Sequence, residues 1–131
     1  MALHWTISHP QKLVIALARD ELGFADIARY LEALAAEKAL PYAKIFDISH
    51  VPAGLDERAV REAAALVRRY AGGLRLGPLA IVAVGDGSFE SARLFAAEAA
   101  AARPLTIFRE LHLARQWLDA QRAPPENTGP E

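Results

Sequence analysis

An unbroken apolar run between a proline and a glycine constrains the fold more than any other part of the sequence. The run is residues 79–84 (LAIVAV), bounded by Pro78 and Gly85. A half-buried strand alternates apolar and polar residues, so an apolar run of this length is typical of a strand covered on both faces. Such strands occur in parallel sheets that have helices packed on each side. The run therefore predicts an α/β protein with this segment at a central position in its sheet.

The rest of the chain alternates between strand-like and helix-like hydrophobic periods. Residues 3–8 and 12–19 have strand patterns and are separated by the short turn His9-Pro10-Gln11, which predicts an antiparallel hairpin. Further strands are expected at 43–48 and 105–109, and helices at 25–38, 55–71, 88–102 and 110–121. The predicted fold is α/β, with a single, mostly parallel five-stranded sheet, an N-terminal antiparallel hairpin strand and four helices.

The length of the chain fits one compact domain. Its 131 residues leave little room for a second core. We expect residues 1–121 to form the domain. Residues 122–131 are polar and rich in proline, and we expect them to form a flexible tail.

The composition excludes several classes of function. Hydrophobic residues make up 53% of the chain and the formal net charge is -1, which argues against a disordered segment and against a general nucleic-acid binder. The absence of cysteine excludes disulfides, thiolate zinc sites and iron–sulfur clusters. No apolar run approaches the roughly 20 residues of a membrane span, and no secretory signal is visible. We expect a cytoplasmic protein that has no membrane span. We also expect it to bind no nucleic acid, no metal and no other cofactor.

Polar residues gather where the predicted parallel strands end. The carboxyl ends of such strands meet at one edge of the sheet, where ligands bind in open α/β folds. The candidates for ligand or partner binding at this edge are Asp47, Ser49, His50, Asp86, Ser88 and Arg109. A simpler explanation also fits, because loops face water and Asp and Ser cap helices.

Two carboxylates at that edge leave an enzymatic alternative open. Asp47 and Asp86 end neighbouring predicted strands, and carboxylate oxygens are ligands that Mg²⁺ prefers. Histidine is a common general base in enzymes, and His50 would supply that group here. A small Mg-dependent or acid/base enzyme is therefore one alternative. The turn at residues 85–88 (GDGS) is neither a P-loop nor a dinucleotide fingerprint, and G-x-S-x-G is absent, so no reaction is identified.

Several segments resemble the SpoIIAA-like branch of the STAS fold. The matching segments are Tyr42 with Lys44-Ile45-Phe46-Asp47, Ala80-Ile81-Val82, Arg93-Leu94-Phe95, and Phe108-Arg109 followed by Ala114 and Trp117-Leu118. The segment that starts at Tyr42 is similar to the family's segment Y-x-K-hydrophobic-hydrophobic-D, and Ala80-Ile81-Val82 is similar to its central strand. Arg93-Leu94-Phe95 is similar to the Arg-Met-Phe step of the third helix, and the residues from Phe108 onward are similar to the closing segment. The resemblance covers roughly residues 4–119.

The resemblance implies a binding or switching role in place of catalysis, and it adds Arg93 to the candidate binding residues. The best-known members are phosphorylated on serine in an Asp-Ser-(Ser/Thr)-Gly motif after the third strand. This chain has Asp47-Ile48-Ser49-His50 there, without a glycine close behind. We therefore expect a non-enzymatic binding or regulatory module that acts through a protein partner or self-association, without the phosphoserine switch.

A carrier of a small apolar or lipid-like ligand is the remaining alternative. An apolar pocket between the sheet and its helices would hold such a molecule. Lipid-binding folds of the Sec14 type are similar in outline to the same family, although they are longer.

Overall fold

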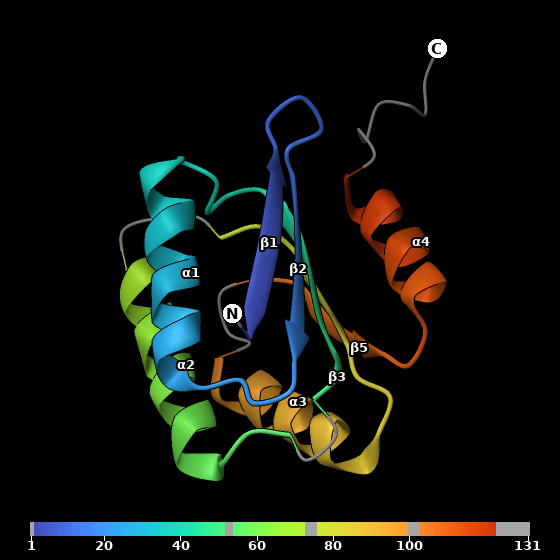
Figure 1. Cartoon of the computed structure of the whole chain (residues 1–131). Helices are drawn as coiled ribbons and strands as arrows, with labels where there is room; N and C mark the ends of the chain where they lie inside the picture. The colour runs from blue at the N-terminus through green and yellow to red at the C-terminus, as the bar shows by residue number, and fades with distance from the viewer. Residues whose placement is uncertain (1, 52–53, 73–75, 100–102, 123–131) are drawn as a thin grey trace.

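The computed structural model describes residues 2–51, 54–72, 76–99 and 103–122, and these residues form one five-stranded sheet with four helices (Figure 1). The strands are β1 (Leu3–Ser8), β2 (Leu13–Arg19), β3 (Ala43–His50), β4 (Leu79–Val82) and β5 (Leu105–Phe108). The helices are α1 (Phe24–Ala36), α2 (Glu57–Ala71), α3 (Asp86–Ala99) and α4 (Leu111–Arg122).

The strands lie in the sheet in the order in which they occur in the chain. The order is β1-β2-β3-β4-β5, so β3 is the middle strand and β5 forms one edge. The hairpin pair β1–β2 is antiparallel, and each of the other pairs is parallel. The predicted fold class and its N-terminal hairpin are confirmed.

Strand β4 is buried along its whole length, as the apolar run predicts. It lies beside the middle strand and ends at Val82, two residues before the apolar run ends. Ala83 still donates its backbone N–H to the Phe108 carbonyl, at 2.8 Å, but the partner strand β5 ends there. Val84 is 50% exposed. The apolar run therefore contains the strand and the first residues of the loop that follows it.

The larger hydrophobic core lies between the sheet and α1, α2 and α3. Leu31 from α1, Val67 from α2 and Ala92 from α3 are buried in this core. Val14 of β2 and Ile48 of β3 belong to the same core, so their side chains lie on the face of the sheet that these helices cover. Figure 1 shows α1 and α2 together on one side of the sheet.

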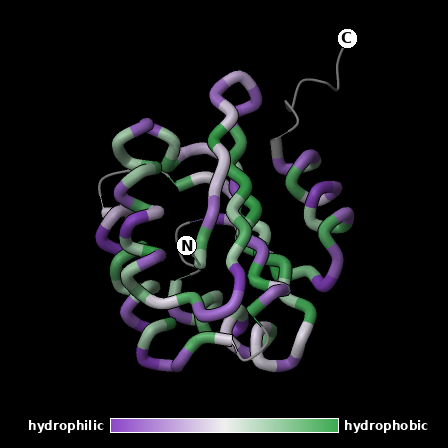
Figure 2. Tube along the Cα trace, viewed as in Figure 1, coloured by the Kyte–Doolittle hydropathy of each residue, from purple (hydrophilic) through white to green (hydrophobic). Residues whose placement is uncertain are grey.

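A smaller core lies on the other face of the sheet, under α4. Ala114 and Leu118 of α4 are buried with Ile45 of β3 and Val82 of β4, and Trp117 packs against them half-buried. Helix α4 contacts β3, β4 and β5. Figure 2 shows hydrophobic residues concentrated along the strands, whereas the helices carry both hydrophobic and hydrophilic residues. The inner strands are apolar on both faces because helices cover both.

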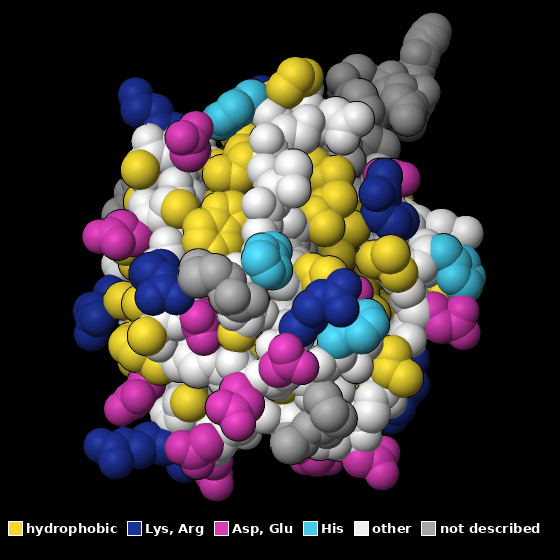
Figure 3. All heavy atoms as spheres, in the orientation of Figure 1, with side chains coloured by type: hydrophobic (Ala, Val, Ile, Leu, Met, Phe, Trp, Pro, Cys, Tyr) yellow, Lys and Arg dark blue, Asp and Glu magenta, His cyan; other side chains and the backbone are white. Residues whose placement is uncertain are grey.

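The outer face of the hairpin is less covered. Ile15 of β2 points to the same face as α4 but is 37% exposed. Figure 3 shows hydrophobic side chains on both sides of the hairpin in that view, with acidic and basic side chains mostly around them.

Element boundaries differ from the predicted ones by a few residues. Helix α2 begins at Glu57 and not at residue 55, and α3 begins at Asp86 and not at residue 88. The predicted end of the third helix (100–102) and most of the predicted tail (123–131) lie outside the described residues. No helix in the described part of the chain is both long enough and apolar enough to span a membrane.

Candidate functional site

Three predicted site residues lie together at the end of β3. The Ser49 hydroxyl donates to Asp47 Oδ1 at 2.6 Å, and the Ser49 backbone N–H donates to the same oxygen at 2.9 Å. The Ser49 Oγ lies 3.4 Å from His50 Nδ1. Each contact joins residues that are neighbours or near neighbours in the chain. The Asp47 carboxylate therefore stabilises the local conformation at the end of its own strand.

A second group forms between β4 and the start of α3. Arg109 donates to the Val84 carbonyl at 2.8 Å, and its guanidinium carbon lies 4.1 Å from the centroid of the Phe89 ring. Ser88 is fully buried and donates to the Gly85 carbonyl at 3.1 Å. These contacts attach the segment after β5 to the loop after β4.

The remaining predicted residues are not joined to either group. Asp86 is exposed in the first turn of α3, and Arg93 is exposed with an ion pair to Glu90 at 3.4 Å. Asp47 lies on β3 and Asp86 follows the adjacent strand β4, but no hydrogen bond or ion pair of the described residues joins the two. Within the described ranges, no group of three His, Cys, Asp or Glu side chains is arranged to hold a metal ion.

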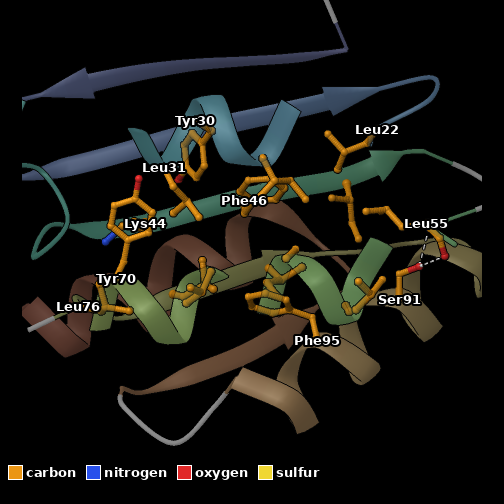
Figure 4. A pocket seen from close by; sticks show the side chains of 18 of the residues that line it. Leu22, Tyr30, Leu31, Lys44, Phe46, Leu55, Tyr70, Leu76, Ser91 and Phe95 are labelled. Atoms are coloured by element: carbon orange, nitrogen blue, oxygen red, sulfur yellow. Dashed lines mark hydrogen bonds between the residues drawn. The ribbon is translucent and has the colours of Figure 1, made fainter. Parts of the chain in front are cut away.

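The clearest candidate site is a cavity inside the larger core, between the middle of the sheet and helices α1, α2 and α3. Its volume is about 80 Å³. The lining residues come from these helices, β3, β4 and the adjoining loops, and they are Leu22, Ile27, Tyr30, Leu31, Leu40, Lys44, Phe46, Ile48, Leu55, Val60, Ala63, Val67, Tyr70, Leu76, Leu79, Ile81, Ser91, Ala92, Phe95 and Arg103. Most of them are apolar. Figure 4 shows their side chains converging from the sheet and the helices on one space.

One end of the cavity holds a buried lysine. Lys44 lies on β3 and is 3% exposed. Its ammonium group donates to the Tyr42 carbonyl at 2.7 Å and to the Leu40 carbonyl. Figure 4 shows Tyr70 and Leu76 at the same end. A lysine is almost never buried this fully unless its charge has a partner.

Two further polar side chains line the cavity, those of Tyr30 and Arg103. The Tyr30 hydroxyl and Arg103 Nε are buried, and neither has a hydrogen-bond partner among the described residues. Arg103 is anchored by its Nη1, which donates to the Gly77 carbonyl at 3.4 Å. Buried polar groups are paired in the great majority of cases, so two unpaired groups on one cavity require an explanation.

The three groups act on one another electrostatically. The pKa of Lys44 is lowered to about 7, mainly by burial and to a smaller extent by the positive charge of Arg103. Burial lowers the pKa of Arg103 to about 10, against the opposing effect of Tyr30. Burial raises the pKa of Tyr30 above its usual value, and Arg103 opposes that rise. Arg103 therefore stays charged at neutral pH and acts electrostatically on both other groups.

No acidic side chain in the described ranges forms an ion pair with these two basic residues. The ion pairs of the described residues involve other basic residues, and none includes Lys44 or Arg103. The polar end of the cavity therefore carries an excess of positive charge in an apolar surrounding.

The opposite end of the cavity is polar but satisfied. The Ser91 hydroxyl accepts from the Leu55 N–H at 2.7 Å and lies 3.3 Å from the Leu55 carbonyl, to which it donates. Gly54, at φ 72°, brings the same loop against α3, because a Cβ there would overlap the Gly87 carbonyl and Ser91 Oγ. Figure 4 shows Leu55 and Ser91 at this end.

The residues at the polar end are not among the predicted site residues. Hydrophobic periodicity places Lys44 within a strand and Tyr30 on the inner side of a helix, and it indicates no functional role for either. One signal was available for Lys44, because a strand with apolar residues on both faces buries a lysine whichever way it points. For Arg103, in the loop before Pro104, the sequence offers no comparable signal.

Comparisons of the chain with known protein families, with curated proteins and with solved structures found no match. The resemblance to the SpoIIAA-like branch therefore stays a prediction. The fold and the cavity define an α/β domain with an internal, mainly apolar cavity and a cationic end.

Proposed function

We propose that this protein is a non-enzymatic binding domain that holds a small apolar or lipid-like molecule between its sheet and α1, α2 and α3. The observation that carries the proposal is the cavity of about 80 Å³ within the larger core. Protein interiors are close-packed and rarely leave a void larger than a water molecule. The resemblance to the SpoIIAA-like branch, with its non-catalytic role, supports the same proposal.

The size of the cavity indicates a closed form of the site. Ligand pockets usually measure about 300–1,000 Å³, and a cavity of about 150 Å³ is known to admit benzene. The described cavity is smaller, so binding requires the helices to move away from the sheet. Ile27 of α1, Leu55 in the loop before α2 and Phe95 of α3 line it and are only half-buried. These side chains mark where the cavity opens.

Calorimetric titration of the full chain with octanoate and with 1-octanol tests this proposal. At least one of the two probes is expected to bind. Ala63 lines the cavity and is 1% exposed, so Ala63→Leu is expected to fill part of the space and weaken binding. Ala65→Leu, on the same helix but outside the cavity, is the control and is expected to bind as the unchanged protein does. If neither probe binds the unchanged protein, the proposal is wrong.

Protein–protein interaction remains a second candidate function. It is favoured by exposed large hydrophobic side chains in the described part of the chain, namely Ile15, Val84, Leu111 and Leu113. Exposed apolar side chains become buried when two copies of a chain associate. Light scattering after size exclusion tests self-association through helix α4, which carries Leu111 and Leu113. We expect a dimer that becomes monomeric in Leu113→Glu, and a monomeric unchanged protein contradicts self-association.

A further inference from the structure

We infer that the molecule held in this cavity carries an anionic headgroup, of which a carboxylate is the simplest, bound by Lys44, the Tyr30 hydroxyl and Arg103 Nε. The inference rests on the proposed function. It narrows the ligand from any apolar molecule to an anionic amphiphile.

The unpaired donors are the first argument for this headgroup. The Tyr30 hydroxyl and Arg103 Nε are both donors, and leaving each one buried without an acceptor is unfavourable. A carboxylate only accepts hydrogen bonds and has lone pairs for several donors at once. A neutral alcohol has fewer acceptor sites and adds a donor of its own. An anionic oxygen group therefore satisfies both side chains better than a neutral headgroup does.

The charge at this end of the cavity is the second argument. Lys44 and Arg103 are two basic residues that line the same cavity, and no ion pair of the described residues neutralises either of them. A buried charge is strongly unfavourable unless an opposite charge accompanies it. The described part of the chain does not supply that charge, so we assign it to the ligand.

The surroundings hold Lys44 in place for this role. The Leu40 carbonyl accepts both from the Lys44 ammonium and from the Gly77 N–H, the latter at 3.2 Å. Gly77 has no space for a side chain, because a Cβ would overlap the Tyr42 and Pro41 carbonyls. An ammonium group has three donors, and the carbonyls of Leu40 and Tyr42 take two of them. One donor remains for a ligand.

The distribution of polar groups also sets the orientation of the ligand. The cationic groups lie at the Lys44 end, and the lining toward Leu22 and Leu55 is apolar apart from the satisfied Ser91 (Figure 4). The headgroup therefore lies beside Lys44, and the apolar chain extends along β3 and β4 toward Leu55. A single anionic end and an apolar remainder match this arrangement.

The test compares two probes that differ only in the headgroup. We expect the full chain to bind octanoate about tenfold more tightly than 1-octanol at about pH 6, where the lysine is protonated. Lys44→Met is expected to remove this preference by weakening octanoate binding about tenfold, with 1-octanol binding retained.

Tyr30→Phe removes one hydroxyl and is expected to reduce the preference for octanoate without affecting the fold. Arg58→Met, which removes a charge from an exposed position on α2, is expected to keep the preference.

The outcomes separate this inference from the proposed function. If both probes bind with equal affinity, the inference is wrong and the proposed function stands. If neither binds, both are wrong. If Lys44→Met fails to fold, Tyr30→Phe tests the inference in its place. An unchanged preference for octanoate in Tyr30→Phe would contradict both the role of the hydroxyl and the inference of an anionic headgroup.

Discussion

At the scale of single residues, Tyr30 contributes to the core in two opposing ways. The Tyr30 ring packs edge-on against Trp5 and Phe46, with centroids 5.5 Å and 5.3 Å away. This aromatic packing holds the ring in the core, while its hydroxyl has no partner among the described residues. The ring stabilises the fold and the hydroxyl opposes it, so the two contributions are separable by substitution.

Tyr30→Phe is expected to stabilise the empty protein by about 1 kcal/mol, because it keeps the aromatic contacts and removes an unsatisfied hydroxyl. Urea unfolding at neutral pH measures this change. Tyr70→Phe is the matched control, because Tyr70 also lines the cavity but its hydroxyl is not among the buried unpaired atoms. The control is expected to change the free energy of unfolding little. Destabilisation by Tyr30→Phe would mean that the hydroxyl has a favourable interaction in the core.

At the scale of the elements, hydrophobic periodicity was sufficient to predict most of the fold. Residues 79–82 are buried on both faces because α4 covers one side and the other three helices cover the opposite side. Residues 83 and 84 continue the apolar pattern after the strand has ended, so composition alone could not place that boundary. Pairing decides it, because β5 ends at Phe108 and offers no further partner.

Helix α4 is the only cover that the described residues provide over its face of β3 and β4. Trp117 packs on Phe108 with ring centroids 5.8 Å apart and contacts the smaller core. We expect Trp117→Ala to destabilise the protein by about 3 kcal/mol, because a large aromatic contact is lost. Chemical denaturation measures the change. Gln116→Ala, at an exposed position on the same helix, is expected to be nearly neutral, and an equally small effect at Trp117 would mean that α4 packs only loosely.

At the scale of the whole molecule, the predicted binding edge and the cavity lie in different parts of the fold. The rule for open α/β sheets directed attention to the carboxyl edge, where Asp47 and Ser49 bond mainly to each other. The cavity lies instead between the layers, and its polar groups come from a helix, a strand and a loop that are far apart in sequence. Their convergence depends on packing, which neither periodicity nor spacing reveals. Only the lysine in an otherwise apolar strand gave a local indication.

The buried lysine makes the stability of the whole domain depend on pH. Its pKa is about 7 in the folded protein and about 10.4 in an unfolded chain. Between these values the unfolded state binds more protons, so the free energy of unfolding rises with pH, by roughly a few kcal/mol in total. Below about pH 7 both states are protonated and this contribution stays constant. The raised pKa of Tyr30 opposes the rise only above about pH 10, where an unfolded tyrosine ionises.

Thermal unfolding of the full chain between about pH 7 and pH 10 measures this effect. We expect the stability to increase across that range in the unchanged protein and to increase much less in Lys44→Met. Arg58→Met, at an exposed site, serves as the control and is expected to retain the increase. Parallel profiles for the unchanged protein and Lys44→Met would show that Lys44 is not the group responsible.

The sequential order of the strands has a consequence for synthesis on the ribosome. Each strand pairs with the one made just before it, so the sheet is able to grow one strand at a time as the chain emerges. Helix α4 is made last, and until it docks, Ile45 and Val82 face water on their side of the nascent sheet. A chain in which α4 has not yet docked would therefore expose an apolar surface, and chaperones would have their greatest effect on this protein at that moment.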